Sequence, residues 1–129
     1  MAAKAPITIN DGQATPVAVT FGVDSTQNGT YQFSDKTAGV SLGFRRLAVS
    51  TKLASGTSAV NRAKFTVELP VTQTVNGITS VAFTLRANTE VILPAAATDQ
   101  NRKDLFAFLY NGLNHSLIKG AVRDLDPIY

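Results

Sequence analysis

The 129-residue sequence predicts an α+β fold, in which an antiparallel sheet is followed by two helices. Up to Leu93, short β-branched and aromatic runs alternate with turn residues, and side chains alternate with the period of two that is typical of strands. After Leu93 the apolar residues take the spacing of amphipathic helices. The length, with 44% hydrophobic and 16% charged residues, favours one domain. We expect a single domain over residues 1–129, with hairpin and sheet in about 1–97 and helices in about 98–129.

The N-terminal region predicts a β-hairpin. Its first arm is Ile7 to Ile9 and its second arm is Val17 to Phe21. The Asn10-Asp11-Gly12 string between them is a turn signal, because Asn, Asp and Gly tolerate positive φ. Two further turn signals and a short strand are marked by Asn28-Gly29, Asn76-Gly77, and Tyr31 with Phe33.

Three longer strands are predicted at residues 46–53, 62–69 and 83–93. Alternation divides each of them into an apolar face, which must be covered, and a polar face. The polar face presents Arg, Lys, Ser, Thr, Asn and Glu side chains, which makes it the candidate binding surface. The candidate binding residues on this face are Arg46, Ser50, Lys52, Arg62, Lys64, Thr66, Arg86, Asn88 and Glu90.

The net charge of +3 is unevenly distributed along the chain. Residues 45–97 contain six basic and two acidic side chains and so carry +4, whereas residues 1–44 carry −1 and residues 98–129 carry 0. A local positive field of this kind attracts polyanions. An ordinary solubilising surface fits the charge distribution equally well.

The last quarter of the sequence predicts two helices. Thr98 or Asp99 is a suitable N-cap for the first helix, and Asn111-Gly112 is a place where it could end or weaken. Ser116 can cap the second helix. The two apolar stripes consist of Leu105, Phe108, Leu109 and Leu113, and of Ile118, Ala121, Val122 and Leu125.

Two short helices are modest cover for a broad sheet in a monomer, so we expect a dimer. If two sheets met edge to edge and the helices of each chain crossed onto its partner, the apolar faces would be buried and the free strand edges paired. The polar faces of the two sheets would then form one continuous basic surface.

The composition argues against most catalytic and metal chemistry. The absence of Cys excludes disulfides, zinc ribbons and cysteine nucleophiles, and a single His excludes a histidine-rich metal site. His115 lies at a predicted helix break, and no Ser has a nucleophile-elbow sequence around it, so we expect a surface or capping role for His115. We therefore expect no enzyme activity, no catalytic residue, no metal and no cofactor.

Residues 1–6 carry one positive charge and no apolar run follows them, so we expect neither a secretory signal nor an anchor, and a cytosolic location. The longest apolar stretch, around residues 87–97, contains Asn88, Glu90 and Pro94 and is too short to span a membrane.

Four strings occur in the order found in a known family. They are Glu68-Leu69-Pro70-Val71-Thr72-Gln73-Thr74-Val75-Asn76-Gly77-Ile78 with its Gln-Thr-Val-x-Gly pattern, Asn61-Arg62, Asn88-Thr89-Glu90, and Asp124-Leu125-Asp126-Pro127-Ile128-Tyr129. Together with the order of elements, over nearly the whole chain, they resemble the coat proteins of small single-stranded RNA bacteriophages, the levivirus type. Residues 71–80 resemble the loop that surrounds the symmetry axes of the shell in that family.

The resemblance implies an N-terminal hairpin, a five-stranded antiparallel sheet and two C-terminal helices that interlock in a homodimer. It further implies an icosahedral virion capsid around genomic RNA, assembled in the cytoplasm of a bacterial host, and translational repression through an RNA stem-loop on the inner sheet face. That face coincides with the polar face derived above. Its basic residues would neutralise phosphates, while Ser50, Thr66, Asn88 and Glu90 could contact base edges or sugars.

Two positions depart from the best-known members of the family. Ala48 aligns with a Thr and Arg86 with a Tyr that stacks on a base; an Arg plane can stack, but an alanine methyl cannot hydrogen-bond an adenine. One alternative for the polar face is a solvated surface with ion pairs such as Arg86 with Glu68 or Glu90. The alternative for the protein is a dimeric RNA-binding module that does not assemble.

Overall fold

The computed structural model describes residues 3–57 and 59–129. Met1 and Ala2, at the start of the segment considered for a secretory signal, lie outside the described residues. The chain forms two compact units, residues 1–92 with most of the sheet and residues 93–129 with the helices. The unit boundary falls close to the point where the sequence period changes.

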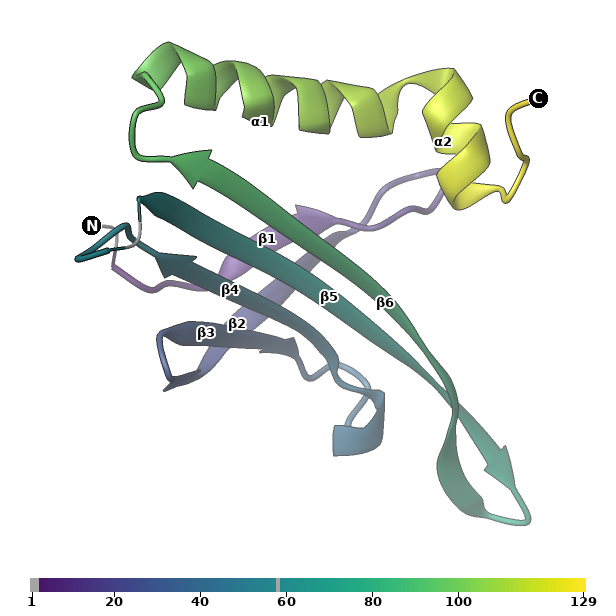
Figure 1. Ribbon diagram of the computed structural model, residues 1–129. Coiled ribbons are helices and arrows are strands. Elements are labelled where there is room, and N and C mark those ends of the chain that lie inside the picture. The colour runs from purple at the N-terminus through teal and green to yellow at the C-terminus, as the bar shows by residue number, and fades with distance from the viewer. Residues whose placement is uncertain (1–2, 58) are drawn as a thin grey trace. The chain divides into compact units, whose positions relative to one another are not determined.

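Six strands in sequence order form one sheet within the described residues (Figure 1). A short 3-10 helix, Ser41–Gly43, precedes the fourth strand. The strands are β1 (Ile7–Asn10), β2 (Ala18–Gln27), β3 (Thr30–Asp35), β4 (Arg45–Lys52), β5 (Val60–Val75) and β6 (Ile78–Pro94).

The predicted fold class is confirmed, and the strand count differs slightly, because the N-terminal hairpin and the rest of the sheet share strand β2 and so form six strands. Strand β2 pairs with β1 through residues 18–21 and continues without a break to pair with β3 through residues 22–27. Because neither a proline nor a pair of turn residues interrupts β2, its backbone hydrogen bonding continues from one partner strand to the next. A register shift between Val23 and Ser25 marks a bulge, which lets one strand serve both pairings.

Both Asn-Gly pairs form tight hairpin turns, as predicted. Asn28 and Gly29 have φ of 51° and 75°, and Asn76 and Gly77 have φ of 52° and 76°. Positive φ at both central residues is the requirement of a type I′ turn, and it matches the twist of the strands on either side. These two turns therefore set the β2–β3 and β5–β6 hairpins.

The first hairpin closes differently from the prediction, because Asn10, Asp11 and Gly12 do not adopt positive φ. The Asp11 carboxylate instead accepts hydrogen bonds from the backbone N–H groups of Gln13, at 3.2 Å, and Val17, at 3.0 Å. The bond from Val17 is the main reason why the pKa of Asp11 lies below its ordinary value. A side chain rather than a left-handed backbone thus closes this loop.

The buried core lies on one face of the sheet. Phe21, Phe33 and Leu47 are buried, with Leu47 only 1% exposed, and Phe33 faces Leu47 across β3 and β4. Burying each of these side chains contributes roughly 1.5–3 kcal/mol. Partly buried apolar side chains packed against this cluster are Ile7, Val19, Val23, Val49 and Val67.

An ion pair with a buried carboxylate borders the core. Asp35 and Arg45 face each other across β3 and β4, and the Asp35 carboxylate accepts from Arg45 Nε at 2.8 Å and from the hydroxyl of Thr37 at 3.0 Å. Burial raises the pKa of Asp35, but these bonds outweigh it, so the pKa lies below its ordinary value. Arg45 therefore neutralises a buried carboxylate and does not belong to the polar face.

Helix α1 spans Asp99–Asn114 and begins with a capping box. Thr98 Oγ1 accepts from the N–H of Asn101 at 3.1 Å, and Asn101 Oδ1 accepts from the N–H of Thr98 at 3.0 Å. The helix does not end at Asn111-Gly112, where the sequence allowed it to end or weaken, but continues to Asn114. One helical glycine costs only about 1 kcal/mol, which does not end a helix whose neighbours remain hydrogen-bonded.

Helix α2 spans Ser116–Arg123, and its N-cap is His115 rather than the predicted Ser116. His115 Nδ1 accepts from the N–H of Leu117 at 3.3 Å, which is the capping role expected for this side chain. At the other end of α2, the Gly120 carbonyl accepts hydrogen bonds from the backbone N–H groups of Asp124 and Asp126. Neither α1 nor α2, the helices of the described chain, is long and apolar enough to cross a membrane.

Candidate nucleic-acid interface

The pairing of β4 with β5 places the predicted polar residues on one face. Residues that face each other across an antiparallel pair project to the same side of the sheet. The opposite side carries Leu47 facing Val67 and Val49 facing Phe65, as alternation predicts. The facing pairs on the polar side are Arg46 with Glu68, Ala48 with Thr66, Ser50 with Lys64, and Lys52 with Arg62.

Two ion pairs bring β6 onto this face. Arg62 Nη1 lies 3.0 Å from Glu90 Oε1, and Arg86 Nε lies 3.3 Å from Glu68 Oε1. Asn88 lies between Arg86 and Glu90 along β6 and shares their parity. The structure therefore brings all nine predicted binding residues to one side of the sheet.

The electrostatic state of this face differs from residue to residue. Arg62 and Arg86 are paired, but their side chains remain 50% and 63% exposed, and an exposed pair contributes only about 0–1 kcal/mol. A phosphate can compete with a carboxylate at that strength. Arg46, Lys52 and Lys64 form no ion pair with any residue in the described ranges. The alternative hypothesis for this face, a solvated surface with ion pairs, thus accounts for two of its five cations.

Strands β2 and β3 add residues that the sequence analysis missed. Thr30 faces Ser50 and Gln32 faces Ala48, so both belong to the polar side. Gln32 Oε1 also accepts from Ser25 Oγ at 3.2 Å. The alternation of Tyr31 and Phe33 could have revealed Thr30 and Gln32, because they occupy the opposite parity of the same strand.

Two hollows are open on the polar face. The Arg46 hollow has a volume of about 410 Å³ and the Lys64 hollow about 620 Å³. The Arg46 hollow is lined by Asp24, Gln32, Arg46, Leu47, Ala48, Thr66 and Glu68. The Lys64 hollow is lined by Asn28, Gly29, Thr30, Ser50, Thr51, Lys52, Arg62 and Lys64.

Asp24, on the wall of the Arg46 hollow, lies within the bulge of β2, and no sequence signal indicated that position. The nearby Ser34 hydroxyl, then Lys36 with Nζ 3.3 Å from Asp24 Oδ1, lower its pKa against the opposing effect of burial. Asp24 is therefore a charged acceptor at neutral pH.

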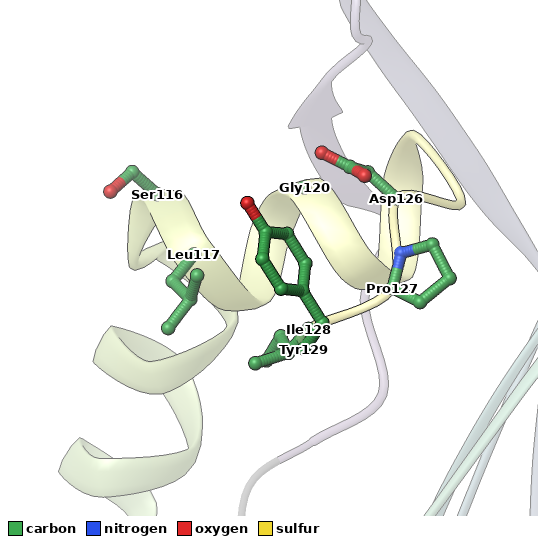
Figure 2. A pocket seen from close by; sticks show the side chains of 7 residues that line it. All are labelled: Ser116, Leu117, Gly120, Asp126, Pro127, Ile128 and Tyr129. Atoms are coloured by element: carbon green, nitrogen blue, oxygen red, sulfur yellow. The ribbon is translucent and has the colours of Figure 1, made fainter.

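A third hollow, of about 530 Å³, lies where the C-terminal segment turns back along α2 (Figure 2). Its polar side chains are Ser116, Asp126 and Tyr129, so it offers no histidine base or paired carboxylates. Asp124 instead forms an ion pair with Arg123, whose Nε lies 2.8 Å from Asp124 Oδ1, and this pairing lowers the pKa of Asp124. Among residues 3–57 and 59–129, no three His, Cys, Asp or Glu side chains are grouped as metal ligands.

The chain is similar to known proteins over its whole length. The family model described as levivirus coat protein matches residues 2–129. The virus-like particle of bacteriophage NT-214 has 28% identity and a TM-score of 0.91, covering 99% of this chain and 100% of that one. The particle of bacteriophage ESE058 has 26% identity and a TM-score of 0.89, covering 99% and 100%.

The chain also shares its fold with the bacteriophage GA protein capsid. The identity is 18% and the TM-score is 0.74, with 97% of each chain covered. The search of curated protein sequences gives no match.

Proposed function

Because the chain belongs to the levivirus coat protein family, whose members are structural capsid proteins and not enzymes, we propose that it forms homodimers that assemble into an icosahedral shell around single-stranded genomic RNA. Assembly takes place in the cytoplasm of a bacterial host. The solved structures of bacteriophages NT-214 and ESE058, which share 28% and 26% identity with the chain, are virus-like particles, and this supports assembly of this chain as well.

The free edge of β6 supports a dimer. Strand β6 is the last strand of the sheet and extends over 17 residues. A long edge strand exposes a row of unpaired N–H and C=O groups, which a second chain can pair. Edge-to-edge pairing of two β6 strands satisfies both rows and places the two polar faces side by side.

The helices supply a second surface for the same partner. Neither α1 nor α2 contains a buried residue, and Phe108 is 75% exposed. Phe106 and Tyr110 on α1 and Val122 on α2 are exposed as well. Exposed apolar surface of this extent marks a protein–protein interface, and in the proposed dimer the partner's sheet covers it.

The β5–β6 ribbon supports contacts between dimers. The pairing of β5 with β4 ends at Glu68, so the last residues of β5 and the first of β6 form a two-stranded extension (Figure 1). Val75 and Ile78 at its tip are 57% and 71% exposed. We assign this tip to contacts around the symmetry axes of the shell, where copies bury these side chains against one another.

The RNA role is carried by one observation, the gathering of five cations on a single sheet face that also holds short polar side chains. Arg46, Lys52 and Lys64, which have no ion-pair partner among the described residues, contact phosphates, whereas Arg62 and Arg86 lie beside them in ion pairs with Glu90 and Glu68. Polar residues among them contact base edges or sugars of a stem-loop, through which the free dimer represses translation. These are Ser50, Thr66, Asn88 and Glu90.

Expression of the chain alone in bacteria tests the proposal. Electron microscopy of the purified protein is expected to show closed particles, and extraction is expected to release RNA protected from nuclease. Dimers that bind RNA but never form particles would support the non-assembling module instead. Particles that contain no RNA and dimers that bind none would rule out the RNA role.

A further inference from the structure

The residue that follows the C-cap of α2 has an unusual backbone conformation. Leu125 has a φ of 58°, in the left-handed region where the Cβ of an L-residue crowds the backbone. Helices that end in this way usually place Gly or Asn at this position. The other non-glycine residues with positive φ in the described ranges are Asn28 and Asn76, and Asn tolerates this conformation. Leu125 is therefore a bulky residue held in a conformation that disfavours it.

Backbone and ionic contacts hold the turn on both sides of Leu125. The Gly120 carbonyl accepts hydrogen bonds from the N–H groups of Asp124 and Asp126, each at 3.1 Å. The Asp124 carboxylate accepts from Arg123 Nε at 2.8 Å and from Arg123 Nη2 at 3.0 Å. These contacts do not use the side chain of Leu125, so a glycine would fit the same turn with less strain.

The side chain of Leu125 is 81% exposed. It continues the apolar stripe of α2, because Ile118, Val122 and Leu125 follow one another at the spacing of one helix face. No residue of α2 is buried, and the exposed fraction rises along the stripe from 37% at Ile118 to 62% at Val122. A single exposed leucine needs no explanation, but a strained leucine at the end of an exposed apolar stripe does.

We infer that Leu125 is a contact residue between two copies of this chain, and that its burial against the second copy offsets the unfavourable backbone conformation. This inference rests on the proposed assembly. The stripe already contains Val122, a residue of the proposed dimer surface, and the similar structures of NT-214 and ESE058 are virus-like particles, so a second copy is the partner. Backbone strain persists where other contacts hold it in place, and it is concentrated at functional sites.

Three substitutions at Leu125 separate a contact between copies from a local role in the turn. Leu125→Asn and Leu125→Gly suit the left-handed backbone but remove the apolar side chain, so association should weaken at least about tenfold. Leu125→Met keeps a flexible apolar side chain of similar size, so its association should stay closer to that of the unmodified protein. Sedimentation equilibrium of the full chain measures association, and circular dichroism checks that the helices are retained.

The control is Leu53, which is 70% exposed just beyond the end of β4. Leu53→Asn makes the same chemical change outside the helices and should leave association unchanged. If Leu125 acted only in the turn, Leu125→Gly would relieve strain and raise the urea midpoint of unfolding without weakening association.

A thiol at the same position tests burial directly. The chain contains no cysteine, so Leu125→Cys and Leu53→Cys each introduce a single reactive group. In the associated protein, the thiol of Leu125→Cys should react with a maleimide at least about tenfold more slowly than that of Leu53→Cys, because thiol reactivity depends on access. In protein unfolded in urea, the two thiols should react at similar rates.

Two groups of results distinguish the failure of this inference from the failure of the proposed function. Undiminished association in Leu125→Asn and Leu125→Gly, or equal thiol reactivity in the associated protein, overturns the inference alone. An unmodified chain that stays monomeric at every concentration overturns the proposed assembly, and the inference with it.

Discussion

Removing Lys64 is expected to change how steeply RNA binding depends on salt. Each phosphate neutralised on a single strand contributes about −0.7 to the slope of log K against log salt. Three cations of the polar face, Arg46, Lys52 and Lys64, have no ion-pair partner among the described residues. The slope per protomer is therefore expected to be about −2.1, and Lys64→Ala reduces it to about −1.4.

This difference is large enough to measure. From 50 to 200 mM salt, the affinity of the unmodified protein for single-stranded RNA should fall about 18-fold per protomer, and that of Lys64→Ala about 7-fold. Fluorescence anisotropy over this salt range measures both. Lys103→Ala, which removes the same charge from α1, is the control and should leave the slope unchanged.

Two results would contradict the reasoning behind this prediction. An unchanged slope in Lys64→Ala would show that Lys64 does not meet phosphate. A slope near −3.5 in the unmodified protein would show that all five cations contact RNA, because this is about five times the contribution of one phosphate. Arg62 and Arg86 would then leave Glu90 and Glu68 completely on binding.

Three further substitutions test the core, the ion pair between Asp35 and Arg45, and the dimer surface. Leu47→Ala is expected to lower the free energy of unfolding by about 2–5 kcal/mol in urea titrations, because Leu47 is fully buried. The pKa of Asp35 is depressed in the folded state, so the stability that this carboxylate contributes is full above its unfolded pKa and is lost as the pH falls through its folded pKa. In Asp35→Asn, the free energy of unfolding should therefore fall less steeply with decreasing pH. An equal dependence on pH in both proteins would contradict this. Phe108→Glu places a charge in the proposed dimer surface and should give monomers by light scattering, with the sheet retained by circular dichroism.

The two faces of the sheet could be predicted because they follow from local alternation. A side chain in a strand projects opposite to its neighbours, so the nine predicted binding residues fell on one face once β4, β5 and β6 formed. The Asn-Gly turns and the start of α1 were equally accessible, since each depends on side-chain chemistry within four residues.

The partners of the predicted residues could not be derived in the same way. Glu68 forms an ion pair with Arg86, 18 positions away, and Glu90 forms one with Arg62, 28 positions away. Such pairings depend on the register of the strands. Asp24 reaches the Arg46 hollow only because β2 bulges. Register is set by the whole set of strand pairings, which short-range patterns do not contain.

By itself the sequence determined which side chains are polar or apolar on each strand, where two hairpins turn and where α1 begins, because these features arise from neighbouring residues. The tertiary structure decided that Arg45 neutralises the buried Asp35 rather than joining the basic face, that β2 serves two strand pairs, and that two hollows open among the cations. Each of these features requires segments distant in sequence to meet in one register, and the free energy of that arrangement belongs to the packed sheet as a whole.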